Sequence, residues 1–203
     1  MGFWDLFRRR PDIGDGAALA DFIDAQAAFL VQKGIYEYAR ARAGVQAKIL
    51  FTEPVFLEAL EKARWQAFPL GLAMVGEAVE SVLRPVGDDP RAVLDGLIAV
   101  VLSVFDRYPA PPVLPAADWS AQRTDLATRL DAVLLHATRP IKDIPEAYID
   151  AYFALMPIHE RLRGSDYPTV RNHLKATLVN IYDIFVKRAD VDALVSDLRA
   201  RIP

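Results

Sequence analysis

Hydrophobic residues recur every three to four positions along most of the chain, with polar residues between them. Leu19, Phe22, Ile23 and Leu30 keep this spacing, which places apolar side chains on one side of an α-helix. Helical segments of this kind begin near Asp15, Thr52, Asp89, Trp119, Glu146, Asp166 and Asp190. No sheet is expected. The pattern predicts an all-α fold, a mostly antiparallel bundle of seven or eight helices.

One segment, residues 89–107, differs from this pattern because its middle, residues 96–105, carries no charge on any side. Asp89 is suited to be the N-cap, and Pro90 occupies the first helical position, where a missing N–H costs nothing. The span is too long for a buried strand, and a helix that is apolar all round must be buried all round. We therefore predict a central helix over residues 89–107 with the other helices packed around it.

A proline-rich segment follows this helix. Residues 108–115 contain four prolines and no charge, so they are expected to be extended and stiff. We predict an N-terminal arm over residues 1–11 and one helical domain over residues 12–203. The proline-rich segment would divide that domain loosely into lobes 12–108 and 118–203.

Two prolines, Pro69 and Pro157, fall inside otherwise helical patterns that are rich in apolar residues. A proline removes a backbone hydrogen bond and crowds the preceding turn, so each helix should kink or break there. Kinked helices leave a gap that aromatic and methionine side chains can line. The candidate pocket residues are Trp65, Gln66, Phe68, Met74, Tyr152, Phe153, Met156 and His159. Gln66 and His159 would orient a ligand there, and the alternative is an ordinary core.

The N-terminal arm has its own amphipathic pattern. On a helix, its apolar residues share one side and three arginines follow them: Phe3, Trp4, Leu6, Phe7, Arg8, Arg9 and Arg10. Burying four such side chains contributes about 6–12 kcal/mol, whereas ordering nine residues costs about 9–18 kcal/mol. A single arm therefore binds weakly. Its apolar side could pack on the protein itself, on a second subunit in a homodimer, on another protein or on an anionic membrane.

Composition narrows the range of functions. The chain has 203 residues, no cysteine and a net charge of −3, with a pI near 5.6. Disulfides and cysteine-bound zinc are therefore impossible, and no overall basic field favours nucleic acid. Apolar stretches are too short to span a bilayer. We expect no metal or cofactor, and a cytoplasmic location, with the inner face of the membrane as an option. Eighteen arginines against six lysines suggest a bacterial source.

Catalytic motifs are not evident. The serines lack the Gly-x-Ser-x-Gly setting, and no Glu-x-x-His, zinc-protease or P-loop pattern occurs. Glu77 and Glu80 are three residues apart, and Glu80 is four residues before Arg84, which is typical of the solvated side of a helix. A hydrolase with His159 as its base is the weakest functional hypothesis.

The predicted function is therefore that of a non-enzymatic helical interaction protein. It would self-associate, or attach peripherally to a membrane, through residues 2–10. The alternative is a binding protein for a small hydrophobic ligand held between the two proline-kinked helices.

Overall fold

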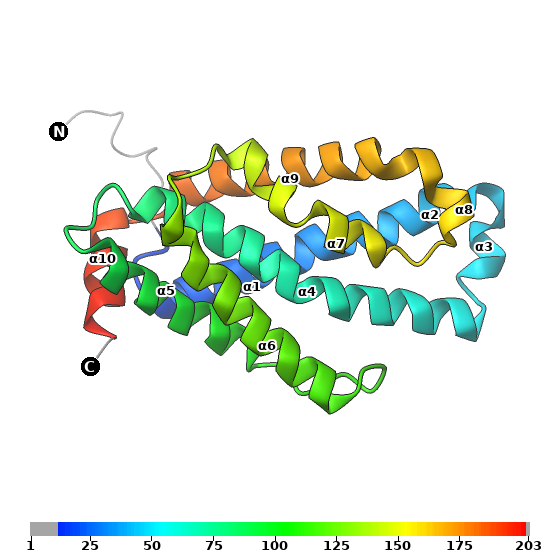
Figure 1. Cartoon of the computed structure of the whole chain (residues 1–203), viewed down its shortest axis with the longest axis horizontal. Coiled ribbons are helices and arrows are strands. Elements are labelled where there is room, and N and C mark those ends of the chain that lie inside the picture. Colours follow the sequence, from blue (N-terminus) through cyan, green and yellow to red (C-terminus); the bar gives the residue numbers. More distant parts are fainter. Residues whose placement is uncertain (1–11, 202–203) are drawn as a thin grey trace, which may run out of the picture.

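The protein is a bundle of helices (Figure 1). The computed structural model describes residues 12–201. The long helices are α1 (Gly16–Gln32), α4 (Pro54–Leu83), α5 (Pro90–Phe105), α6 (Ala116–Asp131) and α9 (Tyr167–Arg188). No strand occurs between residues 12 and 201, where an isolated bridge pairs Ile13 with Ala189. The prediction of an all-α bundle is confirmed.

Shorter helical segments connect these helices. Between α1 and α4 lie a π-helix, η2 (Lys33–Glu37), then α2 (Tyr38–Ala43), η3 (Gly44–Gln46) and α3 (Ala47–Leu50). Between α6 and α9 lie η4 (Ala132–Leu135), η5 (Ile141–Ala147), α7 (Ile149–Ala154), α8 (Glu160–Arg163) and η6 (Gly164–Asp166). The last helix, α10 (Val191–Ala200), lies across one end of the bundle, while α1, α4, α5 and α6 run along it in alternating directions (Figure 1).

Aspartate N-caps fix several helix starts where the sequence predicts them. The side chain of Asp15 accepts hydrogen bonds from the first turn of α1, Asp89 from α5 and Asp190 from α10. A carboxylate at this position satisfies N–H groups that have no partner within the helix.

The central helix is α4, and the prediction that residues 89–107 fill this place is wrong. All residues from 67 to 80 in α4 are buried, and this helix contacts α1, α5, α6, α9 and α10. In α5, by contrast, Ala99 and Ser103 are exposed and Ile98 is only partly buried. Small residues explain how α4 is covered on every side, because its middle is rich in glycine and alanine and neighbouring helices can approach closely.

The two internal prolines behave differently. Helix α4 continues through Pro69, so no break occurs there. The helix predicted over residues 146–163 does break at Pro157: α7 ends at Ala154 and α8 begins at Glu160. At this break the guanidinium of Arg163 donates to the carbonyl oxygens of Phe153 (2.6 Å) and Met156 (3.2 Å).

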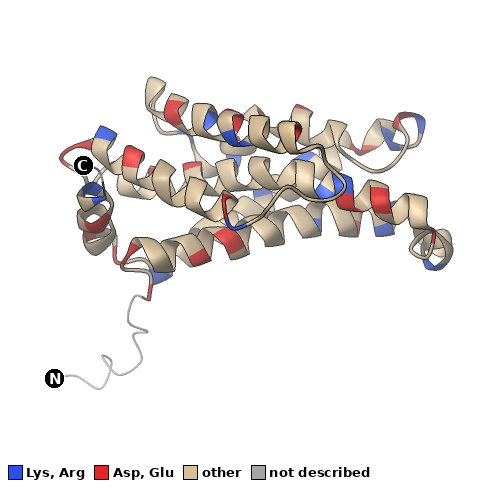
Figure 2. Ribbon diagram, turned by 90° about the horizontal axis from the view of Figure 1, so that it is seen from below, with Lys and Arg blue, Asp and Glu red and all other residues tan. Residues whose placement is uncertain are grey.

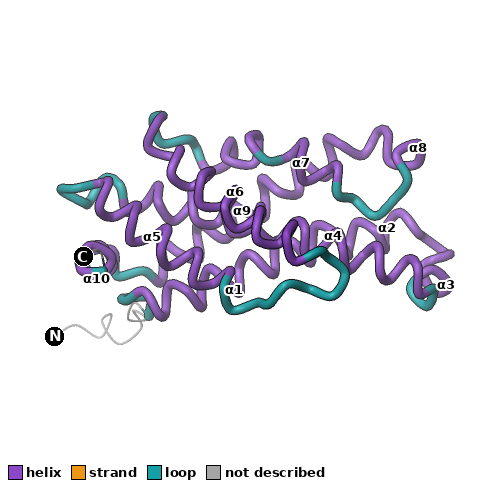
Figure 3. Tube along the Cα trace, turned by 60° about the horizontal axis from the view of Figure 1, so that its bottom comes forward, coloured by secondary structure: helices purple, strands orange, loops and turns teal. Residues whose placement is uncertain are grey.

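The proline-rich segment does not separate two cores. It forms the loop between α5 and α6 (Figure 3), and Leu114 within it is buried. Directly after it, the ring of Trp119 stacks on Phe105 of α5 at 4.3 Å, and its Nε1 donates to the carbonyl of Tyr108 at 3.2 Å. One buried cluster therefore contains residues from both sides of the loop.

Charged residues of both signs are interspersed along the helices (Figure 2). Several ion pairs join different elements, such as Arg171 of α9 with Glu146 of η5 and Arg107 with Asp21 of α1. Within the described residues, no helix is long and apolar enough to cross a membrane.

Candidate functional site

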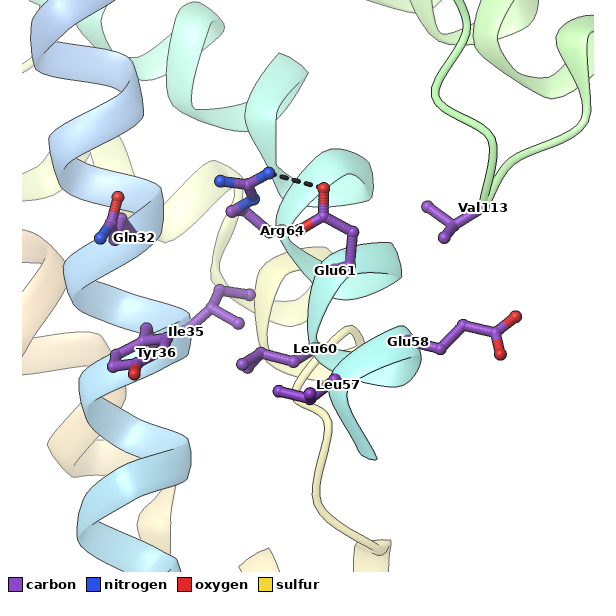
Figure 4. Close-up of a pocket in the computed structure, with 9 residues that line it drawn as sticks. All are labelled: Gln32, Ile35, Tyr36, Leu57, Glu58, Leu60, Glu61, Arg64 and Val113. Atoms are coloured by element: carbon purple, nitrogen blue, oxygen red, sulfur yellow. Dashed lines mark hydrogen bonds and ion pairs between the residues drawn. The ribbon is translucent and has the colours of Figure 1, made fainter. Parts of the chain in front are cut away.

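A hollow with a volume of ≈ 500 Å³ lies on the N-terminal half of α4 (Figure 4). One wall is the end of α1 with η2, the floor is α4, and the other wall is the proline-rich loop. Its lining residues are Gln32, Ile35, Tyr36, Leu57, Glu58, Leu60, Glu61, Arg64 and Val113.

A second hollow of ≈ 230 Å³ adjoins the first, because Gln32 and Arg64 line both. Its other lining residues are Ala28, Val31, Trp65, Phe68 and Tyr108. The rings of Trp65, Phe68 and Tyr108 pack mutually with centroids 5.3–5.9 Å apart. We call the two hollows together the α4 trough. It follows α4 from Leu57 to Phe68, a rise of about 16 Å.

The π-helix η2 forms part of the wall of the trough. Such helices are rare and are found frequently at functional sites. Gly34 allows the tight packing behind this wall, because a Cβ there would lie 2.3 Å from the hydroxyl of Tyr152. That hydroxyl is buried and donates to the carbonyl of Val31 at 3.4 Å. Buried packing on one side of η2 thus holds Ile35 and Tyr36 toward the trough on the other.

Polar groups of the trough are concentrated on α4. The Glu61 Oε1 atom accepts hydrogen bonds from Arg64 Nη2 and Trp65 Nε1, both at 2.6 Å. Arg64 Nε is buried and has no hydrogen-bond partner among the described residues. Glu58 and Glu61 outnumber Arg64, so the lining carries one net negative charge. The Arg64 side chain as a whole is 43% exposed, so its guanidinium presents charge at the surface of the trough.

Exposed aliphatic residues surround the same end of the bundle. Val45 is 93% exposed and Val55 82%, and Ile49 and Leu57 are also exposed. Exposed aliphatic side chains gathered in one region are typical of an interaction surface.

The structure places the eight predicted pocket residues in different surroundings. Trp65 and Phe68 lie together in the trough, whereas Gln66 does not line it. Met74, Tyr152 and Met156 are buried in the core, and Phe153 packs against Tyr167. His159 is exposed at the start of α8, where its Nδ1 accepts from the backbone N–H of Arg161 at 3.3 Å. The structure therefore brings two of the eight together in the trough.

Sequence reasoning missed Ile35, Tyr36 and Leu57. A signal for Leu57 was available, because residues 55–57 are three consecutive apolar residues, more than one side of an amphipathic helix can bury. The residues of the predicted arm, residues 2–10, lie outside the described part of the chain, and their role remains a prediction.

A second polar cluster surrounds Glu77 and Glu80, and the prediction that this pair lies on the solvated side of a helix is wrong. Each is only 3% exposed. Arg139 Nη1 (3.1 Å) and the Tyr148 hydroxyl (3.0 Å) donate to Glu77, and Arg84 donates to both oxygens of Glu80. Arg84 also donates to the carbonyl oxygens of Val133 and His136.

Burial dominates the electrostatics of Glu77. It raises the pKa of the carboxyl above its ordinary value of 4.5, although Arg139 and the Tyr148 hydroxyl act in the opposite direction. The same burial raises the pKa of Tyr148. Through these contacts the cluster joins α4 to the η4–η5 segment.

Metal chemistry has no evident site within residues 12–201, where no three His, Asp or Glu side chains are placed to hold an ion. Comparison of the chain with protein families, with curated proteins and with solved structures found no match.

Proposed function

We propose that this is a non-enzymatic binding protein and that the α4 trough is its binding site for an elongated apolar ligand. The observation that carries the proposal is the trough itself, an apolar and aromatic hollow of ≈ 500 Å³ with a ≈ 230 Å³ extension, next to a π-helix. Ligand sites in proteins usually measure about 300–1,000 Å³ and combine apolar walls with few polar groups.

This proposal keeps the hydrophobic ligand predicted from the sequence and moves its site. The sequence placed the ligand between the helices that contain Pro69 and Pro157. The trough lies instead between α1–η2 and the first half of α4, where Gln32, Glu61 and Arg64 supply the polar groups. The part-exposed guanidinium of Arg64 could donate to a ligand that carries a hydrogen-bond acceptor.

Titration with the neutral apolar dye Nile red tests the site. Leu57→Arg places a charge among the apolar side chains of the trough, so dye affinity should fall by about tenfold, as expected for a loss of about 1.4 kcal/mol. Ile184→Arg on α9 is the matched control, because Leu57 is 41% and Ile184 39% exposed.

The control variant should bind the dye as the unmodified protein does. Equal dye affinity in the Leu57→Arg variant and the unmodified protein would contradict the proposal, and so would an absence of dye binding. Circular dichroism of both variants verifies that each retains its helices.

A further inference from the structure

The chain contains a segment whose chemistry matches that of the trough. We propose that the α4 trough of one molecule receives residues 2–10 of a second copy of this chain. This inference rests on the proposed function and names the ligand of that site.

The lengths agree. Nine residues in the helical form that their pattern predicts span about 14 Å, and the floor of the trough from Leu57 to Phe68 is about 16 Å long. A short helix laid between α1–η2 and the proline-rich loop would therefore occupy most of the trough.

The chemistry also agrees. Residues 3–7 include four large apolar side chains, which suit the aliphatic and aromatic walls of the trough. Arg8, Arg9 and Arg10 follow them, and Glu58 and Glu61 give the trough its net negative charge. Opposite charges at the edge of an apolar contact favour one partner and one orientation.

The arm of the same molecule does not reach this site. The chain before α1 is fastened to the end of α9, where Asp12 N–H donates to the carbonyl of Arg188 at 2.9 Å. From Gly16, the start of α1, to Ala28, the nearest trough residue on that helix, the rise is about 18 Å. With residues 2–10 in helical form, the link from residue 10 to Asp12 spans at most about 7 Å. This link is too short to let the helix lie along the trough of its own molecule.

The resulting contact joins two different surfaces, the arm of one molecule and the trough of the next. Such a contact closes into a dimer when two copies exchange arms around a two-fold axis, and otherwise it continues into open chains or larger rings.

Light scattering of the full chain over a range of concentrations tests the inference. The mass of the unmodified protein should rise with concentration from that of a monomer to that of a dimer or a larger assembly. Trp4→Ser in the arm and Leu57→Arg in the trough should each remain monomeric at those concentrations. The Ile184→Arg control should assemble as the unmodified protein does.

Mixing the two defective variants gives the decisive measurement. One retains a working trough and the other a working arm, so an equimolar mixture should form a 1:1 dimer and stop there. This result also verifies that both variants are folded.

Three outcomes would overturn the inference: an unmodified protein that stays monomeric, a Trp4→Ser variant that assembles normally, or a mixture that remains monomeric. Sedimentation with anionic phospholipid vesicles separates the membrane alternative. Equal vesicle binding by Leu57→Arg and the unmodified protein, without self-assembly, would assign the arm to membranes. Nile red binding that Leu57→Arg abolishes, in a protein that does not self-assemble, would retain the proposed function and reject only its occupant.

Discussion

Gly34 is the residue on which the shape of the trough wall depends most directly. Replacing it by alanine would place a methyl group 2.3 Å from the Tyr152 hydroxyl. Tyr152 is fully buried and cannot swing away. We expect Gly34→Ala to lower the free energy of unfolding by about 1–3 kcal/mol, the usual cost of overpacking, as measured by urea denaturation.

Two further variants show whether the Tyr152 hydroxyl causes the loss of stability in Gly34→Ala. The double variant Gly34→Ala, Tyr152→Phe removes the clashing oxygen and should recover part of the loss. Gly164→Ala adds a methyl group where no atom lies within 4 Å, so its stability should be unchanged or slightly higher. A Gly34→Ala variant as stable as the unmodified protein would contradict the close packing behind η2.

The buried carboxyl of Glu77 should give the free energy of unfolding an unusual pH dependence. Its pKa is raised in the folded state, so folding favours the protonated form. The contribution of Glu77 to stability is therefore fully present below its ordinary pKa of 4.5 and is lost as the pH rises through the raised value. Glutamine does not titrate. The free energy of unfolding of the unmodified protein, relative to Glu77→Gln, should decrease from acidic to neutral pH.

Urea unfolding of both proteins at a series of pH values measures this difference. The exposed Glu58→Gln serves as a control for the loss of a glutamate. A difference between the unmodified protein and Glu77→Gln that increases with pH would show that the ion pair with Arg139 outweighs burial.

At the scale of elements, the docking of α10 onto α5 depends on a close approach at Gly96. A Cβ there would lie 2.3 Å from the backbone carbonyl oxygen of Leu198. A backbone atom cannot be displaced without moving the whole helix. Gly96→Ala should therefore destabilise the protein by about 1–3 kcal/mol, and hydrogen exchange should be faster in α10 than in α4. Unchanged exchange in α10 would contradict this contact.

The existence of the helices could be predicted from the sequence, but their relative burial could not. Apolar spacing and the caps Asp15, Asp89 and Asp190 correctly indicated where α1, α5 and α10 begin. The absence of charge was a poor guide to the centre of the bundle. Glu77 and Glu80 lie within the most buried helix because each forms an ion pair there. The partner of Glu77 is Arg139, which is distant in the sequence, and the partner of Glu80 is Arg84, one helical turn later.

The two prolines illustrate the same limit. Their local patterns are alike, yet the helix continues through Pro69 and stops before Pro157. The difference is supplied by the surroundings: Pro69 is buried among packed helices, whereas Arg163 satisfies the carbonyl groups at the break before Pro157. Partners of this kind come from tertiary structure, which a periodicity in one segment does not contain.

At the scale of the whole molecule, the aromatic part of the candidate site was predictable and its walls were not. Trp65 and Phe68 belong to an apolar run that indicated a pocket. The trough forms only when η2 and the proline-rich loop are brought to opposite sides of α4, a consequence of packing between segments far apart in the sequence.

The bridge between Ile13 and Ala189 has a consequence for how the protein is made. Ile13 is fixed by hydrogen bonds to Arg188 and Asp190, so it lacks these partners until the ribosome has synthesised the chain as far as Asp190. Helix α1 can form early, but this end of the bundle closes only after α10 has left the ribosome. A nascent chain stalled before Arg188 should therefore remain more susceptible to proteases than the finished protein.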